Sequence, residues 1–534
     1  MTDRAYDKDT VWTSAVLPPL APIATDHTAA VCVVGAGIAG LTTAYLLAKE
    51  GRGVIVLDDG AIGGGESGLT TAHIVNALDR RWSELAKLHA PGALRRAAAS
   101  HTAAIDRIEQ IVAEEQIDCE FRRVPGYLFA APGHPPSTIH DEVEAAHWAG
   151  LPLVQEVEQA PLLDFKTGPA ARFPDQAQFH ILRYLSGLAR AVERLGGKIY
   201  TRAHVTEVDE DAEPDHVIVK TDRGVNVRAN EVVLATNTPF LPRLSVHLKQ
   251  AAYRTYVIAL RVPRGEVPPA LYWDTEDPFH YVRLASLGED GPDELLIVGG
   301  EDHKTGQADD ADQRHARLEA WARERFPISG QVVHRWSGEV METVDGLAYI
   351  GRIRKESRVM MVTGDCGNGM THGTIAGMLI TDLVHGRPNE WAELYDPTRI
   401  NISLQAASEY LKENLNTAAQ YADWLTGGDL DDVEKLPRGV GAIMRRGLSK
   451  LAVYRDPQGH LHERSAVCPH AGCIVAWNPA EHTFDCPCHG SRFECTGRVI
   501  HGPATTDLKP VEDETPGQAE QPVEAEAARV IRID

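Results

Sequence analysis

Four of the eight cysteines of the chain fall between residues 468 and 489, a stretch that also carries His470 and His489. The spacing gives two pairs, Cys468-x-His470 and Cys486-x-x-His489, each with one thiolate and one imidazole. Two mixed pairs suit a [2Fe-2S] centre in which two cysteines bind one iron and two histidines bind the other. Zinc is the rival metal, although zinc sites usually pair cysteine with cysteine and histidine with histidine along the chain. The stretch therefore predicts a metal centre, with the iron-sulfur centre favoured.

A second pattern near the start of the chain predicts a dinucleotide site. Gly35, Gly37 and Gly40 follow the G-x-G-x-x-G spacing between an apolar strand and a helix. The glycines permit a tight turn, a close approach of backbone amides to a pyrophosphate, and packing of the helix on the strand. Asp58 ends the next strand, where an acid accepts hydrogen bonds from ribose hydroxyls, and Asp59 is the adjacent alternative.

Three later stretches favour FAD as the dinucleotide. Residues 63–74 form a second glycine-rich turn, residues 231–239 a strand with a small polar end, and residues 345–377 a strand followed by a glycine loop and a helix start. No second G-x-G-x-x-G follows a strand, so a nicotinamide dinucleotide is not expected as electron donor. The further candidate FAD-binding residues are Ser67, Thr70, Thr71, His73, Val205, Thr236, Asn237, Gly364, Gly367, Gly369 and Met370.

These motifs, in this order, resemble the FAD-dependent amine and amino-acid oxidoreductases of the D-amino-acid oxidase and glycine oxidase type. The segments that carry the resemblance are GAGIAGL, GESGLTTAH, residues 175–200, VVLATN, TVDGLAYIG and GDCGNGMTHGTIAG, within residues 25–390. The resemblance implies an α/β FAD-binding doubly wound domain with an antiparallel-sheet substrate domain (α+β), which covers the substrate over the flavin. It also implies a small amine or amino acid as the substrate.

The C-terminal motifs CPHAGC and CPCHGSRF are similar to the Rieske signature, and the similarity covers residues 433–510. It implies that Cys468, His470, Cys486 and His489 bind a Rieske-type [2Fe-2S] cluster in an all-β Rieske domain. It further implies that Cys473 and Cys488 form a disulfide between the two cluster loops and that residues 502–504 cover the cluster.

One position departs from the high-potential Rieske proteins of cytochrome bc complexes. Those proteins have a tyrosine where this chain has Phe493, while Ser491 is present. A serine hydroxyl can donate a hydrogen bond to cluster sulfur, whereas phenylalanine cannot, so we expect a reduction potential below the top of the Rieske range.

The candidate catalytic residues are Tyr256, Tyr281, Arg283, Trp336 and His372. An arginine above the flavin would bind a substrate carboxylate in a bidentate way, but an ordinary strand-face arginine in a salt bridge is the alternative. The aromatic residues also suit plain core packing. Oxidases of the family often place a lysine beside the flavin to assist oxygen, and the strand that ends before His303 and Lys304 lacks one at the expected position.

Composition limits the partners. A net charge of −23 argues against nucleic acid and against an anionic membrane surface. The only long apolar run, residues 29–48, is interrupted by glycines and predicts a strand, a turn and a helix instead of a membrane span. The first residues are acidic and lack the apolar core of an export signal, which favours a cytoplasmic location.

The sequence divides into four predicted parts. Residues 1–400 form the FAD-dependent oxidoreductase, with its substrate subdomain mainly over about 80–180 and 245–345. Residues 401–432 form a linker helix, 433–511 the Rieske domain, and 512–534 an acidic tail.

Combining the two redox groups predicts a dehydrogenase. A flavin takes a hydride, while a [2Fe-2S] centre passes one electron at a time, here to an external acceptor, a protein or a quinone. Two alternatives remain open. One is an oxygen-using amine oxidase with a structural or tuning cluster, and the other is a redox sensor or electron-transfer adaptor whose flavin is reduced by a partner.

Overall fold

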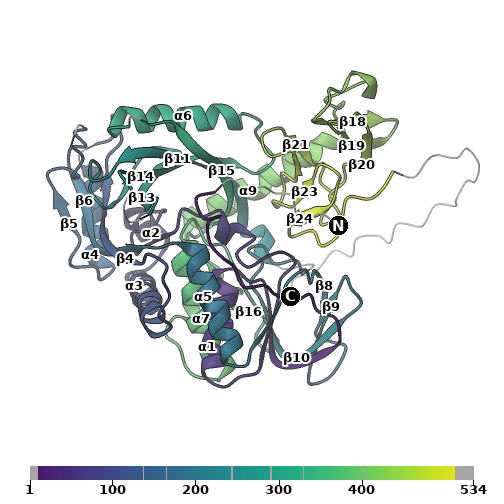
Figure 1. Cartoon of the computed structure of the whole chain (residues 1–534), viewed down its shortest axis with the longest axis horizontal. Coiled ribbons are helices and arrows are strands. Elements are labelled where there is room, and N and C mark those ends of the chain that lie inside the picture. Colours follow the sequence, from purple (N-terminus) through teal and green to yellow (C-terminus); the bar gives the residue numbers. More distant parts are fainter. Residues whose placement is uncertain are drawn as a thin grey trace, which may run out of the picture.

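The protein is described by a computed structural model that covers residues 10–511, apart from 136, 164, 242–244, 289–290, 329 and 402. The acidic tail predicted over 512–534 lies outside the described residues. Figure 1 shows two large sheets flanked by helices, with a small all-β module beside them. No helix of the described part is both long enough and apolar enough to span a bilayer.

The first large sheet has the order β16-β17-β10-β1-β2-β7, with β8 and β9 attached to β10. β1, β2, β7, β10 and β17 run parallel, and the apolar runs of β1 and β2 are buried because helices α1, α5 and α7 pack beside them. Its strands are β1 (His27–Val34), β2 (Val54–Leu57), β7 (Lys198–Tyr200), β8 (Val205–Asp209), β9 (Val217–Thr221), β10 (Asn226–Leu234), β16 (Tyr349–Arg352) and β17 (Val359–Thr363).

The helices that accompany this sheet confirm the doubly wound prediction. The run over 29–48 is the end of β1, a glycine turn and α1, as the sequence predicted. The helices are α1 (Ile38–Lys49), α5 (Ile181–Arg194), α7 (Gly369–Val384) and α8 (Ala392–Tyr395).

The second large sheet has the order β15-β11-β14-β13-β12-β4-β6-β3, with β5 beside β6. Its pairs are antiparallel except β4 with β12, which is parallel, so the predicted antiparallel sheet is in fact mixed. Its strands are β3 (His73–Ile74), β4 (Arg122–Phe129), β5 (Gln155–Val157), β6 (Ala170–Gln178), β11 (Gln250–Pro263), β12 (Leu271–Asp274), β13 (His280–Ser286), β14 (Asp293–Lys304) and β15 (Val332–Thr343). The helices of this part are α2 (Trp82–Leu88), α3 (Pro91–Glu114), α4 (Ser137–Trp148) and α6 (Ala311–Arg325).

The C-terminal module contains two small antiparallel sheets, β18-β19-β20 and β21-β22-β23-β24. The two loops with the candidate metal ligands follow β20 and β22, so both start from ordered strands. The strands are β18 (Val440–Arg446), β19 (Ser449–Arg455), β20 (Leu461–Ser465), β21 (Ala476–Asn478), β22 (Thr483–Asp485), β23 (Arg492–Glu494) and β24 (Val499–His501).

The linker helix is shorter than predicted. α9 spans Leu404–Gln420 and continues as the 3-10 turn η3 (Tyr421–Trp424), and the chain after it is irregular, with one more 3-10 turn, η4 (Val433–Lys435), before β18. Ser403 begins the helix because its hydroxyl accepts a hydrogen bond from the backbone NH of Ala406. Leu430 already forms a bridge with Met444, so residues predicted as helical belong to the edge of the β module.

A buried ionic cluster joins the β module to the second large sheet. Glu481, in the turn between β21 and β22, accepts hydrogen bonds from Arg254 of β11 at 2.6 and 2.8 Å, and also contacts Ser337 and Arg492. Burial alone would raise the pKa of Glu481, but the charges of Arg254 and Arg492 lower it to about 2. The side chain of Arg254 is 1% exposed, so loss of either Arg254 or Glu481 would leave the other charge desolvated, at a large cost in free energy.

The substitution Arg254→Ala should weaken the attachment of the β module. Removing one partner of a buried ion pair costs about 3 kcal/mol, because the remaining charge stays desolvated. Calorimetry of the full chain should therefore show the first thermal transition at a clearly lower temperature. The matched control is Arg498→Ala, which removes a half-exposed pair with Glu494 and should cost below about 1 kcal/mol. Equal melting behaviour of the two variants would contradict the role given to this cluster.

Candidate functional site

A cavity of about 300 Å³ lies between the two large sheets. The first sheet contributes the turns after β1, β2 and β10, and the second contributes residues of β12, β13 and β15. The loop before α7 and the first residues of that helix line a further side.

One end of the cavity is formed by the glycine turn. A Cβ atom on Gly35 would lie 2.3 Å from the carbonyl oxygen of Ala235, so only glycine fits there. The carboxylate of Asp58 accepts a hydrogen bond from the backbone NH of Ala36 at 2.7 Å. The hydroxyl of Ser67 accepts one from the backbone NH of Ile38 at 3.0 Å. The second strand and the second glycine-rich turn therefore fix the shape of the first turn.

Most of the predicted FAD-binding residues lie on this cavity. Two do not: Gly40 packs against the backbone of Gly35, and Gly364 contacts Thr343 beside β16. The predicted residues that line the cavity are Gly35, Gly37, Asp58, Asp59, Ser67, Thr70, Thr71, His73, Val205, Thr236, Asn237, Gly367, Gly369 and Met370.

The other end of the cavity is acidic. Asp79, Asp302, Glu342 and Asp365 line it. Burial raises the pKa of Asp302, Glu342 and Asp365 to about 7, and raises that of Asp79 well above its ordinary value. Among the described residues that line the cavity there is no arginine and no lysine. Such a wall favours a cation over a carboxylate.

Two of the five predicted catalytic residues line the cavity. The hydroxyl of Tyr281 lies 2.6 Å from that of Thr255. His372 binds the carbonyl oxygen of Asp365 through Nδ1 at 2.9 Å, so this nitrogen carries the proton, and its Nε2 is buried with no partner among the described residues. Burial lowers the pKa of His372 to about 4, and the ring is therefore neutral near pH 7.

The other three predicted catalytic residues do not line the cavity in the described part of the chain. Tyr256 bonds His303 at 2.9 Å, and the indole NH of Trp336 donates to the carbonyl oxygen of Leu69 at 2.8 Å. The guanidinium of Arg283 donates to four backbone carbonyl oxygens. Because two of them belong to Thr71 and Ala72, Arg283 holds the turn before His73, which replaces its predicted role as a carboxylate ligand.

The candidate metal ligands converge at the tips of the two module loops. The rings of His470 and His489 lie 4.9 Å apart. Both Nδ1 atoms are buried and find no hydrogen-bond partner in the described part of the chain. Cys468 and Cys486 are buried thiols beside them. Two unpaired imidazole nitrogens next to two thiols are an arrangement that needs a metal centre to satisfy it.

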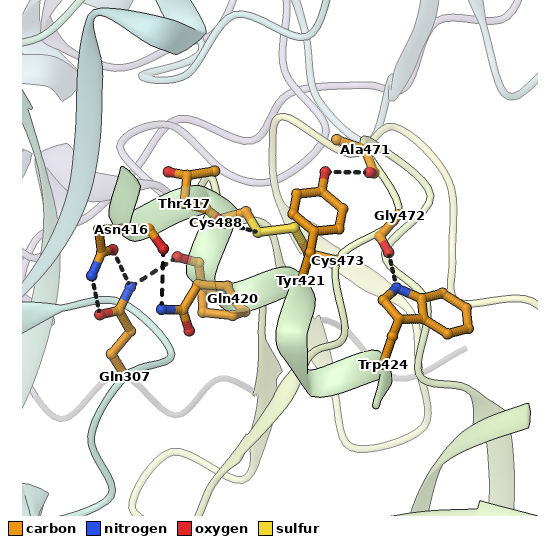
Figure 2. Close-up of a disulfide and its surroundings, with 11 residues drawn as sticks. Gln307, Asn416, Thr417, Gln420, Tyr421, Trp424, Ala471, Gly472, Cys473 and Cys488 are labelled. Carbon is orange, nitrogen blue, oxygen red and sulfur yellow. Dashed lines mark hydrogen bonds between the residues drawn. A yellow bond between two sulfur atoms is a disulfide. The ribbon is translucent and has the colours of Figure 1, made fainter. Parts of the chain in front are cut away.

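A disulfide joins Cys473 to Cys488 and so connects the two loops, as the Rieske resemblance implied. Figure 2 shows how the end of α9 supports it. Tyr421 donates to the carbonyl oxygen of Ala471 at 2.7 Å, and Trp424 to that of Gly472 at 3.0 Å. Gln307, from the loop after β14, contacts Asn416 of α9 at 2.8 Å. The linker therefore holds the first cluster loop against the rest of the chain.

A third histidine covers the two candidate ligands. His247 lies in the 3-10 turn η2 (Ser245–Leu248), which belongs to the larger part of the chain. Its ring lies 5.0 Å from that of His470 and 6.0 Å from that of His489. The edge of the candidate cluster thus faces the larger part of the chain.

Comparison with known families explains both sites. Residues 30–383 match the FAD dependent oxidoreductase (DAO) family, and residues 428–512 match the Rieske [2Fe-2S] domain. The chain belongs to the DAO family of FAD-dependent oxidoreductases. It is an oxidoreductase whose cofactors are FAD and a Rieske-type [2Fe-2S] cluster.

Individual relatives agree with this assignment. The protein YhfW of Bacillus subtilis, whose name calls it a Rieske 2Fe-2S iron-sulfur protein, is 29% identical over 94% of this chain and 97% of its own length. Gamma-glutamylputrescine oxidoreductase of Escherichia coli is 26% identical over 67% of this chain and 83% of its own. The crystal structure of glycine oxidase from Geobacillus kaustophilus shares the fold, with a TM-score of 0.58, 18% identity, and coverage of 70% of this chain and 99% of that one.

The residues present fit both cofactors. The glycine turn has no side chains at its glycine positions and so leaves its backbone open to a dinucleotide. Beside this turn, the buried atoms Asn237 Nδ2 and Thr238 Oγ1 have no hydrogen-bond partner among the described residues. The unpaired Nδ1 atoms of His470 and His489 fit a cluster in the same way.

Reasoning from the sequence missed two groups of cavity residues. The first is the acidic wall, whose members come from four separate segments. The second is the segment 499–505 of the β module, which also lines the cavity. No spacing pattern relates these residues, because only the fold brings them together.

The substitution Ser491→Ala should lower the reduction potential of the cluster. Ser491 accepts a hydrogen bond from the backbone NH of Ala504 at 3.0 Å, and its own hydroxyl lies beside the sulfur of Cys468, where a hydrogen bond would help to hold the charge of a reduced cluster. A net hydrogen bond of about 1 kcal/mol corresponds to about 40 mV for one electron. Redox titration followed by electron paramagnetic resonance (EPR) would measure the shift, with the exposed Ser449→Ala as control. An unchanged potential would show that the hydroxyl does not act on the cluster.

Proposed function

We propose that the protein oxidises a small amine at the carbon next to its nitrogen and passes the electrons singly to an external acceptor, a protein or a quinone. The observation that carries this proposal is the contact between the two sites. Gly490, next to His489, packs so closely on Glu339 of the FAD cavity that a Cβ atom would lie 2.9 Å from its carboxylate oxygen. A cluster at this place can receive electrons from the cavity without an intervening partner.

The proposed ligands of the cluster are Cys468, His470, Cys486 and His489. The proposed FAD site consists of the predicted residues that line the cavity, with the glycine turn and Asp58 at the nucleotide end. When bound, FAD supplies a two-electron acceptor for hydride and the cluster a one-electron acceptor.

The acidic wall favours an amine without a neighbouring carboxylate. A substrate carboxylate needs a cationic partner, and the described lining offers neither arginine nor lysine. A relative at 26% identity is named for a putrescine derivative, which agrees with an amine substrate. The absence of a lysine from the described lining also supports an acceptor other than oxygen.

Asp302 is the proposed acceptor of the substrate proton. An ammonium group must lose a proton before the nitrogen lone pair can assist hydride departure. Asp302 Oδ1 has no hydrogen-bond partner among the described residues, and burial raises the pKa of this carboxyl to about 7, close to working pH. Tyr281 and Thr255 lie beside it and orient the substrate nitrogen.

An anaerobic screen of monoamines, diamines and D- and L-amino acids tests the proposed function. An amine should bleach the flavin absorbance and then produce the EPR signal of the reduced cluster, at up to one spin per cluster. In parallel, oxygen consumption and peroxide formation are measured in air, and matching amounts of the two would identify an oxidase. Flavin bleaching with no cluster signal would contradict electron transfer, and no bleaching by any compound would contradict the oxidation of amines.

The substitution Asp302→Asn should slow flavin reduction by the best amine about 100-fold, because a general base is lost. Stopped-flow absorbance under anaerobic conditions measures this rate. Reduction of the variant by dithionite should still give the normal cluster signal. The control is Asp309→Asn, an exposed acid of the loop after β14 that does not line the cavity. Equal rates in the two variants would remove Asp302 from the mechanism.

A further inference from the structure

The Rieske module contributes to the cavity in which FAD belongs. Val499, Ile500, His501, Gly502, Ala504 and Thr505 all line it. Every other lining residue comes from positions 34–373, within the part of the chain that matches the FAD-dependent family. The segment 499–505 is therefore a wall of the cavity that comes from a different domain.

Polar contacts of two of its residues, His501 and Thr505, hold this segment in place. The ring of His501 forms ion pairs with Glu339 at 3.0 Å and with Glu66 at 3.7 Å. Further along, Nε2 of His204 lies 2.8 Å from the carbonyl oxygen of Thr505, and Nδ1 of the same ring lies 3.5 Å from Asp59. Glu66 and Asp59 are cavity residues of the oxidoreductase part, so the segment is fixed at both of its ends.

The same segment supports the cluster loops. The backbone NH of Ala504 donates to Ser491 at 3.0 Å, and β24 pairs with β23, which follows the second cluster loop. One face of the segment thus contacts the surroundings of the cluster, while the other faces the cavity.

The charge of His501 suits this position. Burial alone would lower the pKa of His501, but Glu339 and Glu66 raise it above its ordinary value. A protonated His501 offsets two carboxylates beside a cavity that must accept the negative pyrophosphate of a dinucleotide.

We infer that residues 499–505 form the closing wall of the FAD site, anchored by His501 to Glu339 and Glu66, so that the Rieske module retains FAD as well as holding the cluster. FAD cannot leave along this side unless the segment first moves away. This inference does not depend on the substrate or on the electron acceptor.

The first test compares FAD release from full-length holoprotein carrying wild-type His501, His501→Ala or His501→Gln. The rise of free-flavin fluorescence after dilution measures the release rate, which should increase at least 10-fold in His501→Ala and less in His501→Gln. Iron content and the EPR line shape should stay normal in both variants. The control is His460→Ala, which removes an exposed histidine of the same module. Release rates within twofold of wild type in both variants would overturn the inference.

A second test needs no substitution. Hydrogen exchange of wild-type protein is compared with and without bound FAD. Peptides that span 499–505 should exchange at least fivefold more slowly when FAD is bound, whereas peptides from β18 and β19 should not change. Equal exchange of 499–505 in the two forms would refute a wall that touches FAD, whatever the variants show.

Discussion

The carboxylate of Glu339 is the point on which the two redox sites of this protein meet. Its side chain has no exposed surface, and a buried carboxylate needs partners on all sides. Thr305 donates to it at 2.9 Å, His501 pairs with it at 3.0 Å, and its own backbone NH donates to Glu66 at 2.5 Å. These partners come from the sheet over the substrate, from the Rieske module and from the glycine-rich turn. The carboxylate of Glu339 therefore joins the Rieske module to this sheet through His501 and Thr305, and the backbone of the same residue joins the sheet to the glycine-rich turn.

Two buried arginines help to hold this framework together. Arg254 neutralises Glu481 of the Rieske module, and Arg283 supports the turn before His73 through backbone carbonyl oxygens. The described lining of the cavity includes four acidic side chains at one end but neither arginine nor lysine, and the charges of Arg80 and Arg314 reach Glu342 and Asp302 only from outside it. A bound amine would supply the missing positive charge, and its presence would favour the ionised form of the raised carboxyls. A cationic amine, the proposed substrate, therefore suits the acidic end of the cavity.

The sequence could predict what depends on local spacing. The glycine turn, Asp58 and the paired Cys and His residues lie in short segments whose geometry is set by neighbouring residues, whereas the Cys473–Cys488 disulfide was implied by the Rieske resemblance. The role of Arg283 as a carboxylate ligand could not be predicted correctly, because the direction of its side chain depends on the turn at Thr71, which lies far away in sequence. The end of α9 was misplaced because the amphipathic pattern continued into η3 and beyond, where contacts with Gly472 replace helical packing. No sequence pattern marked His501, because its partners Glu66 and Glu339 lie far from it in sequence and are brought close only by the fold.

The contacts between the modules also decide how electrons can move. In a design with a mobile Rieske domain, the cluster would leave the flavin site to meet its acceptor. Here such a movement would separate the Arg254–Glu481 and His501–Glu339 pairs, but both members of each pair would regain water, so the pairs alone do not prevent detachment. The docked arrangement already places the second cluster loop against the cavity wall, so the proposed electron transfer from flavin to cluster needs no movement of the module. The route then runs from the cavity wall at Glu339, past Gly490, to ligand loops whose histidines remain partly exposed at the surface.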